Sequence, residues 1–249
     1  MSDSPLRVEG VSLGFGPVEV FRRLSLEIEP GEFVAVVGPS GCGKTTLLNM
    51  LSGFVKPSSG VVACPGRLRM VYQQDSLLPW QTVSENISLG LRGLKDEEER
   101  KTQLGEMLRL IGLGEFASHY PHQLSGGMRQ RVELARALAG DTDVLLLDEP
   151  FSSLDYLTRL RMRKELARML AELPRTVVLV THDIEEAAQL ADRILVLSER
   201  PARVTRELRV ESPRPRELTH PSVVETVHLI LAELGLERDE VSAAARTLV

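Results

Sequence analysis

Short runs of apolar, often β-branched residues alternate along the chain with longer segments whose apolar residues recur at helical spacing. A run that is apolar at every position is typical of a strand buried on both faces of a sheet. Because helical segments separate these runs, we expect a largely parallel sheet. Four runs fit this description: 33–37, 144–147, 177–180 and 194–197.

The first 30 residues follow a different pattern. Their apolar positions, from Val8 to Ile28, are interspersed with glycine, proline and charged residues. This spacing is typical of short strands joined by turns, so we expect antiparallel strands at the edge of the main sheet.

A long helical pattern lies between two of the predicted strands, over about residues 74–139. Thr82 and Glu85 have the spacing of a capping box, which begins a helix near Val83. Asp96 then opens an acidic first turn, followed by a stripe of Leu104, Met107, Leu108 and Ile111 that ends near Gly112 or Gly114. We therefore expect an inserted α-helical subdomain.

The C-terminal part contains a proline-rich stretch, 211–221, and a further helical pattern. Ser222 and Glu225 have capping-box spacing, and Gly235 is a stop signal. The predicted apolar stripe is Val224, Val227, Ile230, Leu231 and Leu234. These patterns divide the chain into a domain at 1–210, with 74–139 inserted, and an extension at 211–249 with one or two helices.

Composition narrows the functional classes. The chain has 249 residues, 43% hydrophobic and 26% charged, as is ordinary for a soluble globular protein. A net charge of −5 argues against binding nucleic acid through phosphate neutralisation. Two cysteines, Cys42 and Cys64, are too few for a disulfide framework and favour a reducing compartment. No secretory signal is visible, and no apolar run approaches the roughly 20 residues that span a bilayer.

The segment from Gly38 to Thr45 fits the phosphate-loop pattern G-x-x-x-x-G-K-[ST]. A predicted strand precedes it and a helical pattern follows, which is the context that the motif requires. Its glycines let backbone N–H groups turn toward phosphate oxygens, at the start of a helix whose dipole attracts anions. Lys44 is expected to reach the β- and γ-phosphates, and the Thr45 hydroxyl to ligate Mg²⁺. The candidate ATP-binding residues are Gly38, Pro39, Ser40, Gly41, Cys42, Gly43, Lys44, Thr45 and Thr46.

A second candidate follows the apolar run 144–147, which ends in Asp148 and Glu149. A carboxylate at the end of a buried strand is costly unless a cation meets it. Mg²⁺ would be that partner for Asp148, while Glu149 would orient and polarise a water for attack on the γ-phosphate. An isolated Asp-Glu pair favours a solvated acidic turn instead, but the phosphate loop upstream favours the Mg²⁺ interpretation.

Four further segments follow in order, and with them the chain resembles the ATP-binding cassette (ABC) family of ATPases over roughly residues 6 to 210. The segments are Val71-Tyr-Gln73, Leu124-Ser-Gly-Gly-Met-Arg-Gln-Arg131, Ser153-Leu-Asp155 and Thr181-His182-Asp183. The resemblance implies an α/β fold with a P-loop NTPase core of mainly parallel sheet, an antiparallel β edge subdomain and an inserted α-helical subdomain. It also implies ATP hydrolysis.

The resemblance assigns roles to residues in these segments. It implies that Ser125, Gly126 and Gly127 form a signature motif that completes the ATP site of a second copy. It also implies that Asp155, in a segment like the family's D-loop, belongs to the nucleotide-binding residues. The expected assembly is a head-to-tail dimer with two sandwiched nucleotides. Residues at the start of a helix present free N–H groups, which suits this role.

Three more residues match functional positions of the family. Gln73 is implied to contact Mg²⁺ and the attacking water; the run that follows favours it over the adjacent Gln74. His182 is implied to contact the γ-phosphate, although a lone histidine is more often a cap or core residue. Phe15 lies where many relatives have a tyrosine that stacks on adenine; the alternative is a simple core aromatic.

A narrower resemblance concerns the importer branch for nitrate, sulfonates, taurine and related anions. It rests on Leu77-Leu-Pro-Trp80, Thr82-Val83, Asn86, Arg200-Pro, Arg203-Val and Pro213-Arg-Pro-Arg216. It implies a peripheral subunit at the cytoplasmic face of the cell membrane, which drives a separate permease and indirectly serves an extracytoplasmic solute-binding protein. Two alternatives stay open: a soluble cassette ATPase acting on ribosomes or DNA, and a nucleotide-sensing module that does not hydrolyse ATP.

Overall fold

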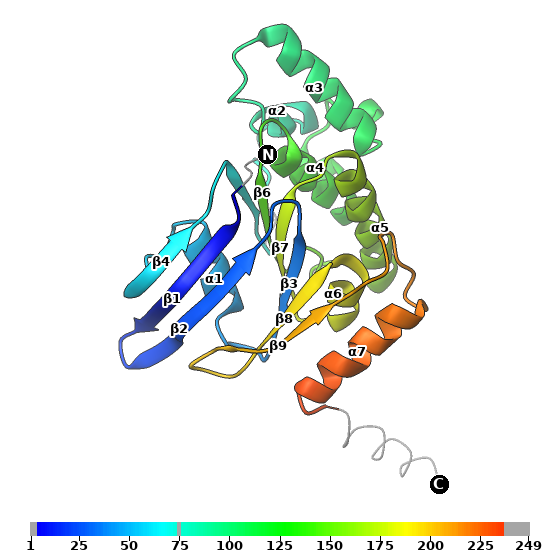
Figure 1. The fold of residues 1–249 in the computed structure, drawn as a ribbon. Helices are drawn as coiled ribbons and strands as arrows, with labels where there is room; N and C mark the ends of the chain where they lie inside the picture. The colour runs from blue at the N-terminus through cyan, green and yellow to red at the C-terminus, as the bar shows by residue number, and fades with distance from the viewer. Residues whose placement is uncertain (1–3, 74–75, 237–249) are drawn as a thin grey trace. The chain divides into compact units, whose positions relative to one another are not determined.

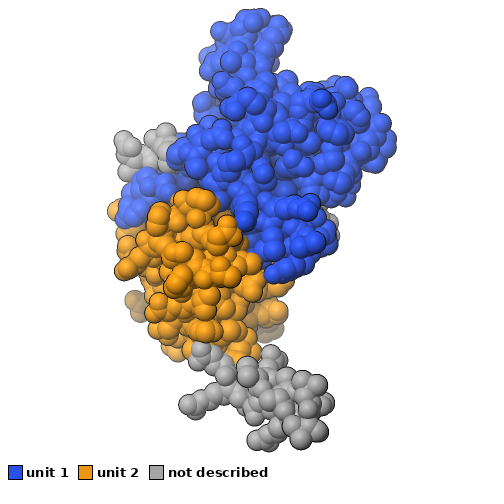
Figure 2. Space-filling model, turned by 90° about the vertical axis from the view of Figure 1, so that its right-hand side faces the viewer, with its two compact units in different colours: residues 1–6, 28–32, 64–178 blue, residues 7–27, 33–63, 179–249 orange. Residues whose placement is uncertain are grey.

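The computed structural model describes residues 4–73 and 76–236, in the arrangement of elements shown in Figure 1. The chain forms two compact units, coloured separately in Figure 2. Unit 1 consists of Met1–Leu6, Ile28–Glu32 and Cys64–Val178, and unit 2 of Arg7–Glu27, Phe33–Ala63 and Leu179–Val249.

Unit 1 contains parallel strands β5 (Leu68–Val71) and β6 (Val144–Asp148), followed in the sheet by β7 (Thr176–Val180), which ends in unit 2. β5 and β6 pair with Val71 opposite Leu147. Every residue of β6 is buried, as the apolar run predicts. The register matters for the site because it places the residues after both strands at the same edge of the sheet.

Helices make up most of the rest of unit 1: α2 (Val83–Ser88), α3 (Glu97–Leu110), α4 (Gly126–Leu138) and α5 (Tyr156–Glu172), with short 3-10 turns at Gly114–Phe116 and Pro121–Gln123. The capping box that begins α2 is confirmed. The N–H of Glu85 donates to Thr82 Oγ1 at 3.2 Å, and the N–H of Thr82 donates to Glu85 Oε2 at 2.7 Å.

Helix α3 also begins as predicted, because Asp96 accepts a hydrogen bond from the N–H of Glu98 at 2.9 Å and an acidic first turn follows. Of its predicted apolar stripe, Met107 and Ile111 are buried, together with Leu110. The stripe packs toward α2 and α4.

Unit 2 contains two groups of strands. The smaller sheet has the order β2-β1-β4, with β1 (Leu6–Phe15) antiparallel to β4 (Ser59–Ala63) and β2 (Val18–Ile28) on its other side. The larger group is β3 (Phe33–Val37), β8 (Arg193–Leu197) and β9 (Val204–Arg209). β3 is parallel to β8 and buried at every position, whereas β9 is antiparallel. The antiparallel edge and the buried parallel strands are both as expected.

Three helices belong to unit 2: α1 (Lys44–Leu51), α6 (Ile184–Leu190) and α7 (Pro221–Glu233). Arg216, in the segment before α7, is buried and donates to the carbonyl oxygens of Ala191 at 2.7 Å and Val210 at 3.1 Å. Arg214 pairs with Asp192 at 3.0 Å. The proline-rich segment is therefore anchored near the end of α6.

The predicted capping box of α7 is wrong. The helix begins at Pro221, and its cap is His220, whose Nδ1 accepts from the N–H of Ser222 at 3.3 Å. Proline suits the first helical position because its missing N–H would be unpaired there in any case. Ser222 thus lies inside the first turn.

The buried face of α7 also differs from the predicted stripe. Its buried residues are Val223, Thr226 and Ile230, whereas Val224 of the predicted stripe is exposed. The stop at Gly235, with φ +74°, is confirmed. A second helix in the extension would fall at 237–249, outside the described residues. Within the described ranges no helix is long and apolar enough to cross a membrane.

Candidate functional site

The phosphate loop of unit 2 runs from the end of β3 into α1 and has left-handed backbone at Gly41, φ +74°, and Gly43, φ +122°. A Cβ on Gly43 would lie 2.6 Å from Val20 Cγ1 and 3.1 Å from Phe21 Cζ. Backbone conformation and close packing both require glycine at this position. Strand β2 therefore packs directly against the start of α1.

Lys44 is the first residue of α1, and its side chain turns back over the loop. Its ammonium Nζ donates to the carbonyl oxygens of Gly38 at 2.8 Å and Pro39 at 3.0 Å. Only 8% of the residue is exposed. The next residue, Thr45, is exposed, and Thr46 is half-buried, like Pro39, while Ser40 is exposed. The loop thus combines a fixed cation with the N–H groups of a helix start, which have no partner inside the helix.

Cys42 lies within the loop and is buried. Burial raises the pKa of its thiol, and the nearby Lys44 ammonium opposes that shift. The thiol is therefore neutral and shielded at neutral pH.

The aromatic candidate, Phe15, is 53% exposed at the end of β1. It precedes the turn into β2, the strand that supplies the contacts of Val20 and Phe21 to the Gly43 position. An exposed ring on this part of unit 2 is open to stacking with a flat ligand. The simple core role is excluded by the exposure.

His182 follows the last residues of β7 and is exposed. The N–H of its neighbour Thr181 donates to the carbonyl oxygen of Val36 at 3.3 Å. Val36 lies two residues before Gly38, so the structure brings the His182 segment beside the strand that leads into the phosphate loop.

In unit 1, the register of β5 and β6 brings Gln73 and Glu149 together. Each lies two residues beyond the paired Val71 and Leu147, and Gln73 Nε2 donates to Glu149 Oε2 at 3.3 Å. Asp148, the last residue of β6, is buried. The two predicted carboxylates therefore differ in environment, since Asp148 is buried and Glu149 accepts a hydrogen bond from Gln73.

Glu149 has left-handed backbone with φ +45°, a conformation that is uncommon outside glycine. Its carbonyl oxygen accepts hydrogen bonds from the N–H of Ser152 at 3.2 Å and the Oγ of Ser152 at 3.0 Å. Strained backbone of this kind persists only where its surroundings fix it. The turn thus holds the Glu149 side chain beside Gln73.

The start of α4 holds the other candidates of unit 1. Ser125 caps the helix, its Oγ accepting from the N–H of Met128 at 3.3 Å. A Cβ on Gly127 would lie 2.9 Å from Thr158 Cγ2, so α4 begins in close contact with the first turn of α5. Asp155 caps α5 by accepting from the N–H of Thr158 at 3.1 Å, and hydrogen bonds to Thr158 lower the pKa of its carboxyl. The starts of α4 and α5 therefore lie together.

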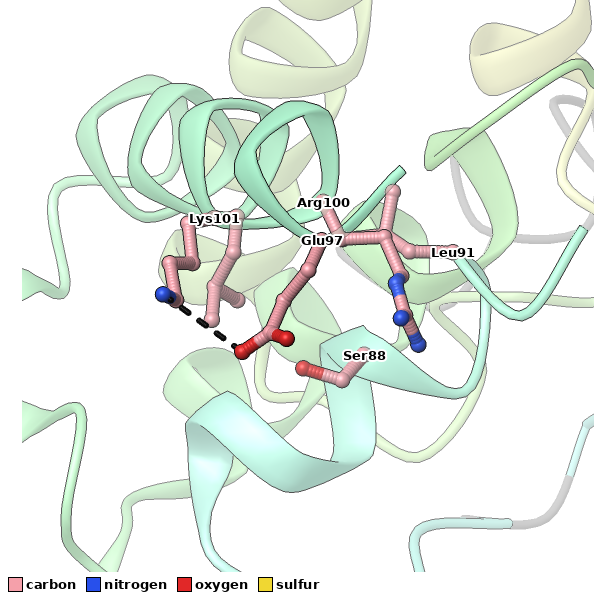
Figure 3. A pocket seen from close by; sticks show the side chains of 6 residues that line it. Ser88, Leu91, Glu97, Arg100 and Lys101 are labelled. Atoms are coloured by element: carbon pink, nitrogen blue, oxygen red, sulfur yellow. Dashed lines mark ion pairs between the residues drawn. The ribbon is translucent and has the colours of Figure 1, made fainter. Parts of the chain in front are cut away.

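A cavity of about 260 Å³ between α2 and α3 was not indicated by the sequence. Figure 3 shows residues that line it, among them Lys101, which pairs with Glu97 at 3.4 Å. No motif marks it, because its lining comes from two separate helices. It is lined by Ser88, Leu91, Glu97, Arg100, Lys101 and Leu104.

The loop before α2 carries Trp80, which is 70% exposed. Asn86, fully buried, fixes this loop: its Nδ2 donates to the carbonyl oxygens of Leu78 at 3.1 Å and Gln81 at 3.0 Å, and its Oδ1 accepts from the N–H of Leu78 at 2.8 Å. A large apolar side chain is thus presented to solvent on a loop that the hydrogen bonds of Asn86 fix.

Comparisons with known proteins agree with these features. A family model described as ABC transporter matches residues 21–152. The chain is similar to the aliphatic sulfonates import ATP-binding protein SsuB 1 of Rhodococcus jostii, 46% identical over 85% of each chain. It is also similar to the taurine import ATP-binding protein TauB of Rhizobium johnstonii, 45% identical over 80% of this chain and 81% of that protein. A solved dimeric structure of a bacterial ABC transporter cassette matches at a TM-score of 0.70, with 33% identity over 84% of this chain and 100% of that one.

Proposed function

The chain belongs to the ABC transporter family, and we propose that it is the ATP-hydrolysing subunit that powers a separate membrane permease importing a small sulfonate or related anion. The observation that carries the hydrolytic part is the pairing of Gln73 with Glu149 beside the buried Asp148. The importing part is supported by the two relatives, which are named as import ATP-binding proteins for sulfonates and taurine. We propose that residues 1–210 form the ATPase domain, that residues 74–139 are its helical insertion, and that residues 211–249 form an extension.

ATP would bind at the phosphate loop of unit 2. The loop residues from Gly38 to Thr46 would surround the phosphates, all except Pro39 having a backbone N–H to donate. Lys44 would exchange its hydrogen bonds to the carbonyl oxygens of Gly38 and Pro39 for contacts with the β- and γ-phosphate oxygens. Phe15 would stack on the adenine ring. Because the ammonium is already held at the loop, little side-chain ordering remains to be done on binding.

Mg²⁺ fits the donors present. The described residues contain no cluster of three or more His, Cys, Asp or Glu side chains that could hold a metal by themselves. Mg²⁺ is usually held by one or two protein oxygens together with substrate phosphates and waters. Thr45, Asp148 and Gln73 would supply such oxygens, and the ion would neutralise phosphate charge.

Hydrolysis would then need one positioned water. Its oxygen would attack the γ-phosphorus while the bond to the β-phosphate oxygen breaks, giving ADP and inorganic phosphate. Glu149 would accept a hydrogen bond and a proton from this water, Gln73 would help to orient it, and His182 would donate a hydrogen bond to the γ-phosphate. Lys44 would stabilise the charge that develops on the leaving oxygens.

A second copy would complete each site. Ser125, Gly126, Gly127 and Asp155 lie at adjacent helix starts, where the first N–H groups have no partner inside the helix. Such groups suit the γ-phosphate of an ATP bound to the other copy, in a head-to-tail dimer. The dimeric form of the solved relative supports this assembly.

The permease would dock on the cavity between α2 and α3 and on the nearby Trp80 loop. Both belong to unit 1, and the lining of the cavity includes cationic, anionic and leucine side chains. This surface would place the subunit peripherally at the cytoplasmic face of the membrane. An extracytoplasmic solute-binding protein would act on the permease, and selectivity among nitrate, sulfonates and taurine would be determined there.

Uptake measurements in the source cells test this function. Cells lacking the gene would be complemented with the unchanged chain, with Lys44→Ala or with Lys56→Ala, an exposed control, and supplied with labelled taurine, ethanesulfonate or nitrate. We expect one uptake activity to disappear on deletion and to return with the unchanged chain and the control only. Unchanged uptake of all three solutes would contradict import of this class.

Capture of the tagged chain from detergent-solubilised membranes separates the rival functions. A co-purifying multi-span permease supports transport. Recovery with ribosomes or DNA and without a permease would favour the soluble cassette ATPase, and absence of ATP turnover would favour the nucleotide-sensing module.

A further inference from the structure

A closed ring of three hydrogen bonds surrounds the backbone at His182. The Thr181 hydroxyl Oγ1 donates to Glu186 Oε2 at 2.5 Å and accepts from the N–H of Asp183 at 3.0 Å. The N–H of Glu186 donates to Asp183 Oδ1 at 3.0 Å and closes the ring. The residues on both sides of His182 are therefore held by side chains, while His182 itself is exposed.

The ring is buried although its components are polar. Thr181 is 1% and Glu186 2% exposed. A glutamate is rarely buried this deeply, because its carboxylate loses the hydration that water provides. Capping of α6 does not require it, since Asp183 already accepts from the Glu186 N–H. The buried carboxylate accepts the hydrogen bond of the Thr181 hydroxyl through Oε2.

Thr181 also connects the ring to the phosphate loop. Its N–H donates to the carbonyl oxygen of Val36 at 3.3 Å, and Val36 precedes Gly38 by two residues. The backbone N–H thus fixes Thr181 relative to β3, and the hydroxyl fixes Asp183 relative to Thr181. His182 lies between these two fixed points.

We propose that Thr181 and Glu186 are positioning residues for His182, which set the direction of the imidazole toward the γ-phosphate. This inference rests on the proposed role of His182. Neither side chain touches the nucleotide in this account; each acts through the backbone of His182. Because a displacement of about 1 Å can cost about 100-fold in rate, loss of the ring should lower turnover strongly.

Matched variants of the full chain test the ring. Thr181→Val removes the hydroxyl at nearly constant shape, and Thr181→Ser keeps it. Glu186→Ala removes the acceptor, Glu186→Gln restores one without the charge, and Glu185→Ala changes the exposed neighbour on the same helix. We expect kcat for phosphate release to fall about 10- to 100-fold in Thr181→Val and Glu186→Ala, with ATP affinity nearly unchanged. Thr181→Ser, Glu186→Gln and Glu185→Ala should stay within a fewfold of the unchanged chain.

A double-variant comparison shows whether the ring acts through His182. If it does, Thr181→Val should change kcat by less than about twofold in a His182→Ala background, because the group it positions is gone. If the double variant loses kcat by the product of the two single losses, the inference is overturned. It is also overturned if Thr181→Val and Thr181→Ser have the same kcat. An unchanged kcat in His182→Ala alone would instead contradict the proposed role of His182, and the ring would lose its function with it. Thermal unfolding of each variant identifies any that fail to fold. If Thr181→Val fails to fold, the comparison of Glu186→Ala with Glu186→Gln replaces that of Thr181→Val with Thr181→Ser.

Discussion

The side-chain amide of Gln73 donates a hydrogen bond to the carboxylate of Glu149, with 3.3 Å between Nε2 and Oε2. The contact follows from strand register: Val71 pairs with Leu147, and both residues lie two positions further along. The left-handed backbone of Glu149 turns its side chain to the same edge. An attacking water at this edge would be within reach of both groups, so each should affect turnover more than ATP binding.

The first prediction concerns Gln73. Gln73→Ala should lower kcat about tenfold or more, because Glu149 loses the hydrogen bond from Gln73 and the water loses one orienting group. Gln73→Glu should be slower still, since two carboxylates would face each other. Phosphate release at saturating ATP measures both, with Gln103→Ala on α3 as control. Equal rates in all four proteins would show that the contact has no catalytic meaning.

The second prediction concerns Lys44, whose ammonium is held by the carbonyl oxygens of Gly38 and Pro39. Lys44→Ala should weaken ATP binding about 100-fold, because a cation at the phosphates is lost from a partly enclosed site. Titration with a fluorescent ATP analogue measures the affinity. Lys56→Ala, which removes an exposed lysine after α1, should bind normally. Unchanged ATP affinity in Lys44→Ala would contradict the assignment of residues 38–45 as the phosphate loop.

The third prediction concerns the contact between α4 and α5. Gly127→Ala should lower the free energy of unfolding by about 1–3 kcal/mol, because the new methyl group lies 2.9 Å from Thr158 Cγ2. Gly126→Ala should cost less, since its Cβ would lie at an ordinary 3.4 Å from Leu154 Cδ2. Denaturant unfolding measures the difference.

Thr158→Ser provides the matched rescue for Gly127→Ala, because it removes the methyl group that clashes and keeps the residue polar. The double variant should regain most of the lost stability. The close approach of the two helix starts is wrong if Gly127→Ala and Gly126→Ala lower the free energy of unfolding equally. It is also wrong if adding Thr158→Ser to Gly127→Ala restores none of that free energy.

The fourth prediction concerns the two thiols. Burial raises the pKa of Cys64 to about 11 and also raises that of Cys42. A thiol is reactive only as thiolate, so both should be alkylated slowly near pH 8 in the folded chain and faster as the pH rises, toward about 11 for Cys64. Mass spectrometry after iodoacetamide treatment, with urea-unfolded protein as reference, measures both rates. Equal rates folded and unfolded would contradict the burial.

The raised pKa values have a consequence for stability. The folded state binds the thiol protons more tightly than the unfolded state, so this contribution is complete below the unfolded thiol pKa and is lost as pH rises toward about 11 for Cys64. Cys64→Ser should therefore flatten the decline of stability over this alkaline range.

Local patterns in the sequence predicted much of this fold and site. The buried runs became β3, β6, β7 and β8, and the capping residues Thr82 and Asp96 begin α2 and α3 as expected. These features depend on neighbouring residues, which the sequence displays directly. The contact of Gln73 with Glu149 depends on the register between strands that are distant in sequence, and no local pattern determines it.

The sequence predicted one feature wrongly and gave no sign of two others. The cap of α7 was misplaced because Ser222 and Glu225 satisfy the spacing, while His220 and Pro221 determine where the helix begins. The cavity between α2 and α3 and the burial of Glu186 depend on tertiary packing. A glutamate in a helix is expected at the surface, so nothing in the sequence distinguished Glu186 from Glu185.

The most direct test of the account is phosphate release by the unchanged chain and by Glu149→Gln, measured beside ATP affinity in the same preparations. The variant keeps the shape and hydrogen-bonding capacity of the side chain but loses the carboxylate that would accept the proton of the attacking water. We predict steady phosphate release by the unchanged chain, a loss of about 100-fold or more in the variant, and ATP affinity that is unchanged or tighter. Substantial phosphate release by Glu149→Gln would contradict the assignment of Glu149, and with it the central claim about how this chain hydrolyses ATP.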